Sequence, residues 1–156
     1  MDGHNFERLK AHILSLSVGQ TFDIARTEWS LKAIELSDEW DQCPCGQDIK
    51  EHCYIHNRYS GANTYVGNVC INRFIQIETG NLFEGLRRIR EDVRANANAD
   101  LIEHAWRMGY LFDVKEYSFL KQTVRKRHLS EKQLAWKEKI NRRILAATVV
   151  QKRTTR

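Results

Sequence analysis

The stretch from residue 43 to residue 70, CPCGQDIKEHCYIHNRYSGANTYVGNVC, contains all four cysteines of the 156-residue chain. Its opening CPCG is typical of a tight metal-binding turn. Proline fixes one φ angle, and glycine admits a left-handed or strained backbone that lets nearby amides approach the sulfur atoms. The C-x-C spacing is one residue shorter than the common C-x2-C spacing.

The residues between the cysteines predict a β-hairpin. Side chains alternate between two faces along residues 49–56, and residues 63–67 offer a second short strand. The connecting RYSGAN contains the Ser, Gly and Asn of a hairpin loop. Cys53 falls in the first strand, and Cys70 falls in the first turn of a helix predicted to begin near Asn68. The positive end of the helix dipole favours a thiolate at that place.

Four thiols and two imidazoles within one short block predict a metal site, because structural zinc prefers a closed tetrahedron of these donors. We predict Zn²⁺ as the cofactor. The predicted ligands are Cys43, Cys45, Cys53 and Cys70, with His52 or His56 as the alternate to Cys53. Buried unreactive thiols and two disulfides are the alternatives. Disulfides are disfavoured because we expect a reducing, cytoplasmic location.

That expectation comes from the rest of the sequence. The N-terminus lacks a basic start followed by an apolar run, and no window approaches the roughly 18 apolar residues of a membrane span. We therefore predict a soluble protein with no membrane partner. Hydrophobic residues make up 42% of the chain, which is enough for a packed core in at least one domain.

Outside the cysteine block the patterns are mostly helical. Apolar spacing predicts a helix over residues 4–16, and a weak alternation predicts a strand over 31–36. Four further helices are predicted at about 82–95, 101–108, 114–127 and 131–147. Each follows a capping-box pattern that can satisfy unpaired backbone N–H groups. The four patterns are Asn81 with Glu84, Asp100 with Glu103, Asp113 with Glu116, and Ser130 with Gln133.

Charge is distributed unevenly along the chain. From residue 121 to the end there are twelve Lys and Arg against two Glu, a net charge of +10, whereas the first 120 residues sum to −5. Such asymmetry favours a basic arm that binds a polyanion, although a Lys-rich solvated helix would look the same. The candidate nucleic-acid-binding residues are Arg125, Lys126, Arg127, Lys132, Lys139, Arg142, Arg143, Lys152 and Arg153.

The pattern C-P-C-G, followed by I-K-E-H-C-Y-I-H-N and V-G-N-V-C-I-N-R-F, resembles the treble-clef type of zinc-binding module found in small accessory proteins of bacteriophages and related mobile elements. Residues 25–29 (A-R-T-E-W), 119–120 (F-L) and 129–133 (L-S-E-K-Q) also look like recurrent pieces of such proteins. In treble clefs the helix usually supplies two ligands, whereas this helix offers only Cys70.

The resemblance implies a metal-stabilised scaffold and assigns no activity. Together with the residue patterns it gives an α+β fold, with a small treble-clef-like zinc hairpin module and a predominantly helical C-terminal half. The expected organisation is an N-terminal helix and zinc module at 1–80, a helical region with a basic last helix at 81–148, and a mobile basic tail at 149–156.

We predict no enzymatic activity. No Ser nucleophile elbow, Walker loop or dinucleotide glycine pattern occurs. An HNH-like nuclease is a further alternative, because such enzymes are built on a treble-clef core and His52, His56 and Asn57 lie near the zinc module. However, the helix after Cys70 carries no His or Asp to hold a catalytic Mg²⁺.

The predicted function is nucleic-acid binding of low sequence specificity by a zinc-stabilised accessory protein. Basic side chains would track phosphates. The three hairpin tyrosines have two alternative roles, stacking on unpaired bases or packing within the protein: Tyr54, Tyr59 and Tyr65. The alternative is a protein-binding regulator or inhibitor of a host or defence complex, favoured by the acidic first 120 residues.

Overall fold

A computed structural model describes residues 3–151 and confirms the α+β class. The chain divides into two compact units, Met1–Thr79 and Gly80–Arg156, which are described separately. All three strands of the described chain lie in the first unit, and the second unit is helical. No helix within residues 3–151 is both long and apolar enough to cross a membrane.

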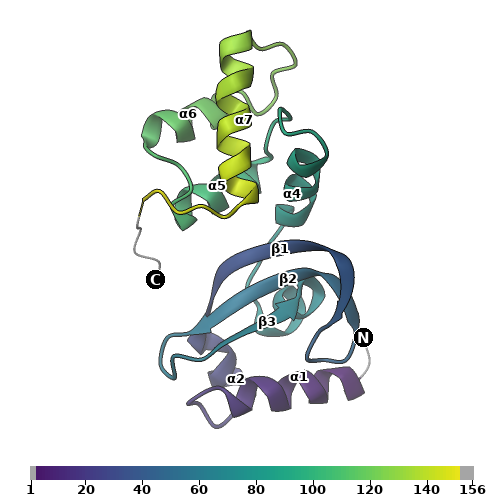
Figure 1. The fold of residues 1–156 in the computed structure, drawn as a ribbon. Helices are drawn as coiled ribbons and strands as arrows, with labels where there is room; N and C mark the ends of the chain where they lie inside the picture. Colours follow the sequence, from purple (N-terminus) through teal and green to yellow (C-terminus); the bar gives the residue numbers. More distant parts are fainter. Residues whose placement is uncertain (1–2, 152–156) are drawn as a thin grey trace. The chain divides into compact units, whose positions relative to one another are not determined.

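The first unit places a three-stranded antiparallel sheet between helical segments (Figure 1). The cysteine block supplies its last two strands and the helix that follows them. In chain order the elements are α1 (Gly3–Ser15), α2 (Phe22–Ala25), the 3₁₀ turn η1 (Arg26–Glu28), β1 (Trp29–Gln42), β2 (Asp48–Asn57), β3 (Asn63–Gly67), α3 (Asn68–Cys70) and the π-helical segment η2 (Ile71–Ile75).

The predicted hairpin is present as β2 and β3, with Cys53 paired to Val66 across it. The first strand is much longer than the predicted 31–36. Leu36 pairs with Glu51 and Asp41 with Ile49, so residues 37–40 bulge out of the ladder between them. A bulge breaks the two-residue alternation by which a strand is recognised, so the alternation along this segment of the sequence is weak.

The core of the first unit lies between the sheet and the helices. Cys53, Ile55 and Val66 on the sheet are almost completely buried, as are Leu9 and Ile13 of α1. Burying an aliphatic side chain of this size stabilises a fold by about 1.5–3 kcal/mol. Figure 1 shows α1 running beneath the sheet. One polar link, a 2.7 Å hydrogen bond between His12 Nε2 and Thr64 Oγ1, joins α1 to β3.

A buried carboxylate closes the loop that leads into the sheet. Glu28 accepts hydrogen bonds from the backbone N–H groups of Val18 (2.9 Å) and Gly19 (2.6 Å) and from Asn57 Nδ2 (2.9 Å). Burial would raise the pKa of Glu28, but these hydrogen bonds hold it below its usual value. The charged form is therefore the stable one, since all its partners are donors.

The second unit contains four of the predicted helices. Their bounds are α4 (Leu82–Glu91), α5 (Ala99–Met108), α6 (Val114–Gln122) and α7 (Glu131–Leu145). Both α4 and α6 end earlier than predicted. After α6, Thr123 Oγ1 donates to the carbonyl of Phe119, and after α4, Asn141 Nδ2 donates to the carbonyls of Val93 and Ala95. Side chains thus satisfy backbone groups that a longer helix would have paired.

The four capping predictions have different outcomes. At α4 the capping box is absent, because Asn81 occupies the N-cap but its side chain makes no capping hydrogen bond. The capping box of Ser130 and Gln133 is confirmed, and the Asp113 side chain accepts from the N–H of Glu116 as expected. At α5 the prediction is wrong, because Asn98 rather than Asp100 is the N-cap. The Asp100 carboxylate instead accepts from the N–H of Asn81. Both residues can serve as caps, so only the tertiary contact decides between them.

Candidate metal centre

Three of the four cysteines converge on one point. The Sγ atoms of Cys43, Cys45 and Cys70 all lie within 4.8 Å of one another, and all three residues are buried. Cys43 and Cys45 come from the turn between β1 and β2, and Cys70 comes from the helix that follows β3. All four cysteines are free thiols, so the disulfide alternative does not describe this structure.

The CPCG turn has the geometry expected of a metal-binding knuckle. Gly46 adopts a φ of 101°, which an L side chain rarely tolerates, and its N–H donates to the carbonyl of Cys43 at 2.7 Å. The turn aims backbone donors at the sulfur atoms. The N–H of Gln47 lies 3.4 Å from Cys45 Sγ, and the N–H of Gly67 lies 3.3 Å from Cys43 Sγ. Such donors stabilise thiolates that bind a metal.

The spacing of the thiols fits a thiophilic metal ion. Cys43 Sγ and Cys70 Sγ lie 3.7 Å apart. Two sulfur atoms bound at about 2.3 Å to one tetrahedral zinc ion are separated by about 3.8 Å. A buried group of thiols with this spacing, surrounded by backbone donors, can therefore hold a metal ion without large rearrangement. Thiolate donors suit zinc, copper(I) and iron, and they do not suit magnesium or calcium.

The protonation of the thiols is linked. The hydrogen bond between Cys43 and Cys70, opposed by burial and aided by the N–H groups of Cys45 and Gly67, lowers the pKa of Cys43 to about 6. The same hydrogen bond, together with burial, raises the pKa of Cys70, and burial raises the pKa of Cys45. The shared hydrogen bond therefore favours the thiolate at Cys43 and the neutral thiol at Cys70. A bound cation would displace the protons that remain, because metals bind the thiolate form.

The structure does not bring Cys53 into this group. Cys53 is completely buried in the middle of the sheet, between Ile34 on β1 and Val66 on β3. Its thiol lies outside the set of ligand atoms within 4.8 Å of one another. Burial raises the pKa of Cys53 to about 12, so a neutral thiol is favoured there. The predicted four-cysteine shell is thus assembled only in part, because Cys53 sits within the sheet rather than at its end.

The two alternate histidine ligands also lie outside the group. His52 and His56 belong to the opposite face of β2 from Cys53, as the alternation of the strand requires. His52 Nε2 lies 3.1 Å from Asp41 Oδ2, and the ring packs against Tyr65. His56 Nδ1 pairs with Asn63 Oδ1 at 2.8 Å. Neither ring replaces Cys53 in this arrangement.

One neighbour of the centre was missed in the sequence. The guanidinium of Arg8, on α1, packs against Gly46 in the space that a Cβ atom would occupy. This contact places a cationic side chain of α1 against the CPCG turn. No local pattern links residue 8 to residue 46, so only the docking of α1 against the turn could reveal this contact.

The predicted nucleic-acid-binding residues have several environments. Arg125, Lys126, Arg127, Lys132 and Lys139 are exposed, and none of them forms an ion pair within the described residues. Lys152 and Arg153 lie outside the described residues.

The two neighbouring arginines of α7 both form ion pairs, but they differ from each other in exposure. Arg142 is exposed and pairs with Glu138 at 3.2 Å. Arg143 is mostly buried, and its guanidinium contacts both carboxylate oxygens of Glu116, at 2.9 and 2.6 Å. We therefore assign Arg143 to the fold of the second unit rather than to a binding surface.

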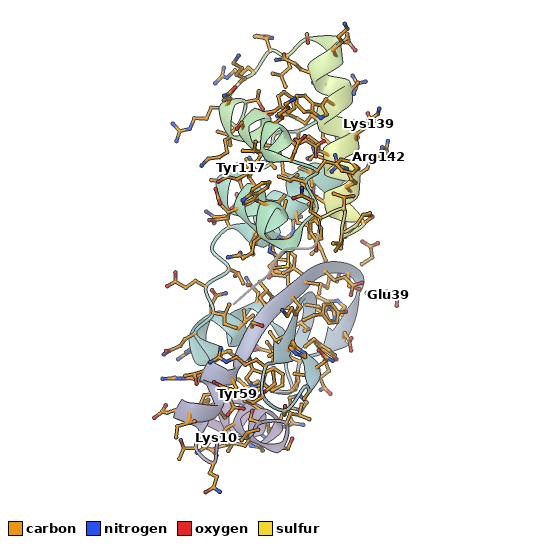
Figure 2. The ribbon with its side chains drawn as sticks, turned by 90° about the vertical axis from the view of Figure 1, so that its left-hand side faces the viewer. Lys10, Glu39, Tyr59, Tyr117, Lys139 and Arg142 are labelled. Atoms are coloured by element: carbon orange, nitrogen blue, oxygen red, sulfur yellow. The ribbon has the colours of Figure 1, made fainter. Side chains whose placement is uncertain are left out.

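The hairpin tyrosines are arranged mainly for packing. Tyr54 donates to Glu35 Oε1 at 2.8 Å and Tyr65 donates to the carbonyl of Gln42 at 2.8 Å, with their rings 6.1 Å apart. Tyr59 is 65% exposed on the hairpin loop (Figure 2). Of the three predicted stacking residues Tyr59 is the most exposed, and the Arg58 guanidinium lies 5.0 Å from the centre of its ring.

Comparison with known proteins gives no further guidance, because no family model, curated protein or solved structure matches the chain. The functional inferences below therefore rest on the residues and their geometry.

Proposed function

We propose that this chain is a zinc-stabilised, treble-clef-like accessory protein of the mobile-element type that binds nucleic acid with low sequence specificity and has no enzymatic activity. Zinc is proposed because it accepts buried thiolates in a cytoplasmic, reducing setting and needs no redox partner. The ion would join separate segments of the first unit, since Cys43, Cys45 and Cys70 connect the turn before β2 to the helix after β3. The binding surface is proposed on the second unit.

The observation that carries this proposal is the division of charge between the units. The first unit contains seven Lys and Arg against eleven Asp and Glu, whereas the second contains eighteen against nine. The two net charges are −4 and +9. A surplus of this size on a small helical unit attracts polyanions, and phosphate contacts of this kind do not depend on base sequence.

Within the second unit the surplus gathers around the start of α7. We define the basic surface as Arg125, Lys126, Arg127, Lys132 and Lys139. Figure 2 shows Lys139 on α7. Lys132 lies seven residues before Lys139, so the two lysines occupy the same side of this helix, about 10 Å apart along its axis.

The loop that carries the three other basic residues is fastened to the unit. Asn96 Nδ2 donates to the carbonyl of Lys126 at 2.8 Å, and the N–H of Lys126 donates to the carbonyl of Thr123 at 3.1 Å. Anchoring of the backbone at Lys126 reduces the entropy lost when neighbouring side chains bind phosphates.

A retardation assay with single- and double-stranded DNA and RNA, at two salt concentrations, tests the proposal. We expect binding that weakens steeply as salt increases and that varies little between sequences of one length. Replacing both Lys132 and Lys139 with Gln should weaken binding without unfolding the chain. Absence of binding at low salt would reject a nucleic-acid function.

A second candidate function, regulation of a host or defence complex through protein binding, is favoured by the bulge of β1. Trp40 lies in this bulge and is 68% exposed, with Lys50 Nζ 4.8 Å from its ring centre. Glu39 and Asp41 flank it in the sequence. Tryptophan is enriched among the residues that dominate binding energy at protein interfaces, and acidic neighbours would select a basic partner surface.

A pull-down from host lysate, with and without nuclease treatment, separates the two functions. A partner that survives nuclease treatment and is lost with Trp40→Ala would support protein binding through the bulge. Retention that depends on intact nucleic acid and ignores Trp40→Ala would support the first proposal.

A further inference from the structure

The cluster of three cysteine thiols differs from a closed zinc site in its number of ligands. Structural zinc sites use four protein ligands, whereas sites that bind an exchangeable ligand use three protein ligands and leave a fourth position for water or a substrate. Among the His, Cys, Asp and Glu side chains of residues 3–151, the ones that meet at this point are Cys43, Cys45 and Cys70. The number of ligands therefore decides which kind of site the chain has.

We propose that the metal centre is a three-thiolate site made by Cys43, Cys45 and Cys70, with Cys53 as a buried spectator and with a fourth coordination position filled by an exchangeable small ligand such as water or a thiol. This inference rests on the metal binding included in the proposed function.

The place of Cys53 in the sheet supports its exclusion. Cys53 is held by strand pairing on both sides, opposite Ile34 and opposite Val66. A regular strand fixes the direction of each side chain, so moving this sulfur to the group would require a shift of β2. Gly67, which follows Val66 at the end of β3, directs its N–H at Cys43 Sγ, 3.3 Å away. That contact locks the end of β3 onto the turn in its present register.

The three thiols, by contrast, lie on segments that are already brought together. Cys43 donates its N–H to the carbonyl of Gln47 at 2.8 Å, which closes the turn around Cys45. The Sγ atoms of Cys43 and Cys70 lie at the separation that two ligands of one metal ion require. An ion bound to three sulfur atoms keeps room in its coordination sphere, and a soft donor such as a small thiol is the ligand class that a thiophilic ion prefers.

Cobalt(II) substitution of the full-length chain tests this assignment, because sulfur-to-cobalt charge-transfer absorbance increases with the number of bound thiolates. The key comparison is Cys53→Ser against Cys70→Ser, two substitutions of buried thiols in the same unit. Cys53→Ala is a third variant, which guards against an effect of a buried hydroxyl. Folding of each variant is followed by circular dichroism, and bound cobalt is counted by elemental analysis.

We expect one cobalt per chain and the same spectrum in the wild type, Cys53→Ser and Cys53→Ala. Cys70→Ser should lose the metal or about one third of the charge-transfer absorbance, as one of three thiolates is removed. Added 2-mercaptoethanol should raise the absorbance of the wild type and of Cys53→Ser by about one third, as a fourth sulfur binds.

Other outcomes would overturn the assignment in distinguishable ways. Lower charge-transfer absorbance in both folded Cys53 variants would indicate a closed four-cysteine site. A spectrum that does not respond to the added thiol would indicate that another group of the chain already fills the fourth position. If the wild type binds neither cobalt nor zinc, the metal binding of the proposed function fails as well.

Discussion

Arg143 and Glu116, separated by 27 residues in the chain, form a two-pronged ion pair inside the second unit, with Nη2 of the arginine 2.6 Å from Oε2 of the carboxylate. Glu116 also accepts from Trp136 Nε1 at 3.1 Å and from the N–H of Phe112 at 2.8 Å. This one carboxylate therefore joins α6, α7 and the loop that precedes α6.

Loss of this pair should destabilise the second unit strongly. Arg143→Met leaves a charged Glu116 without its cation, so we expect the free energy of unfolding to fall by about 3–5 kcal/mol. Urea denaturation followed by circular dichroism measures the change. The neighbouring Arg142→Met is the matched control, because its pair with Glu138 is exposed and should contribute little. Equal effects of the two substitutions would contradict this account.

The same pair predicts an acid dependence. Burial would raise the pKa of Glu116, but hydrogen bonds from Arg143 and others hold it below the usual 4.5. The pair therefore contributes fully above pH 4.5, and its contribution is lost as pH falls through the lower folded-state pKa. The stability difference between wild type and Arg143→Met should shrink over that acid range. A difference that stays constant down to pH 2 would disagree.

Lys137 predicts a second pH dependence, at alkaline pH. Its side chain is fully buried, its Nζ donates to Asn96 Oδ1 and, at 2.9 Å, to Thr123 Oγ1, and burial lowers its pKa from 10.5 to about 8. Between these values the unfolded chain holds a proton that the folded chain has released, so stability rises with pH.

The measurement is the free energy of unfolding of metal-loaded wild type minus that of Lys137→Met, determined by urea denaturation at several pH values. We expect this difference to increase from pH 8 to pH 10.5 and to be constant well below pH 8. Lys139→Met removes an exposed lysine of the same helix and is the matched comparison. A flat profile for Lys137→Met would show that burial does not perturb this amine.

Removal of the metal should affect the first unit selectively. A chelator leaves the thiols of Cys43, Cys45 and Cys70 without the ion that joins their segments, and structural metal sites contribute directly to folding. We expect these three cysteines to be alkylated rapidly after chelation, with Cys53 reacting more slowly because it is enclosed by the sheet. Mass spectrometry of the alkylated peptides measures the order. Cys53 reacting first would contradict the described packing.

The circular dichroism signal of the helices provides an internal control for the chelation experiment. The helices α4 to α7 belong to the second unit, which contains none of the four cysteines. Far-ultraviolet circular dichroism should therefore retain most of its helical intensity when the metal is removed. Complete loss of helix on chelation would mean that the second unit depends on the centre for its stability.

The basic surface predicts a change in salt dependence rather than in affinity alone. Each phosphate contact with duplex DNA contributes about 0.9 to the slope of log K against log salt, so replacing Arg125, Lys126 and Arg127 with Ala should reduce the slope by about 2.7. Fluorescence anisotropy at several salt concentrations measures it. A double substitution with Ala of Lys10 and Lys115, two lysines that are not part of the defined basic surface, should leave the slope unchanged. An unchanged slope in the triple variant would place binding elsewhere.

The N-terminal end of α7 gives a test of local structure. Ser130 Oγ accepts from the N–H of Gln133 and Gln133 Oε1 accepts from the N–H of Ser130, at 3.2 and 3.0 Å. Ser130→Ala should lower the free energy of unfolding by about 1 kcal/mol. Asn81→Ala is the control, because Asn81 occupies the N-cap of α4 without a capping side-chain bond. A loss of similar size in both variants would refute the difference between these caps.

Local chemistry accounts for most of what the sequence could predict. The CPCG turn, the hairpin and the capping box at Ser130 were predicted from residues within a few positions of one another, and all three are present. The ends of α4 and α6 were not predicted, since they depend on side chains such as Asn141, which comes from another helix. The bulge in β1 was also hidden, because it interrupts the alternation that would reveal the strand.

By itself the sequence determined that the thiols are concentrated in one block and that the positive charge lies near the C-terminus. Only the tertiary structure decided which thiols meet and which charges are free. Cys53 and Cys70 look alike in the sequence, but one is enclosed by strand pairing and the other lies at a helix start beside the turn. Arg142 and Arg143 are neighbours, yet a rotation of about 100° per helical residue turns one outward and the other toward Glu116.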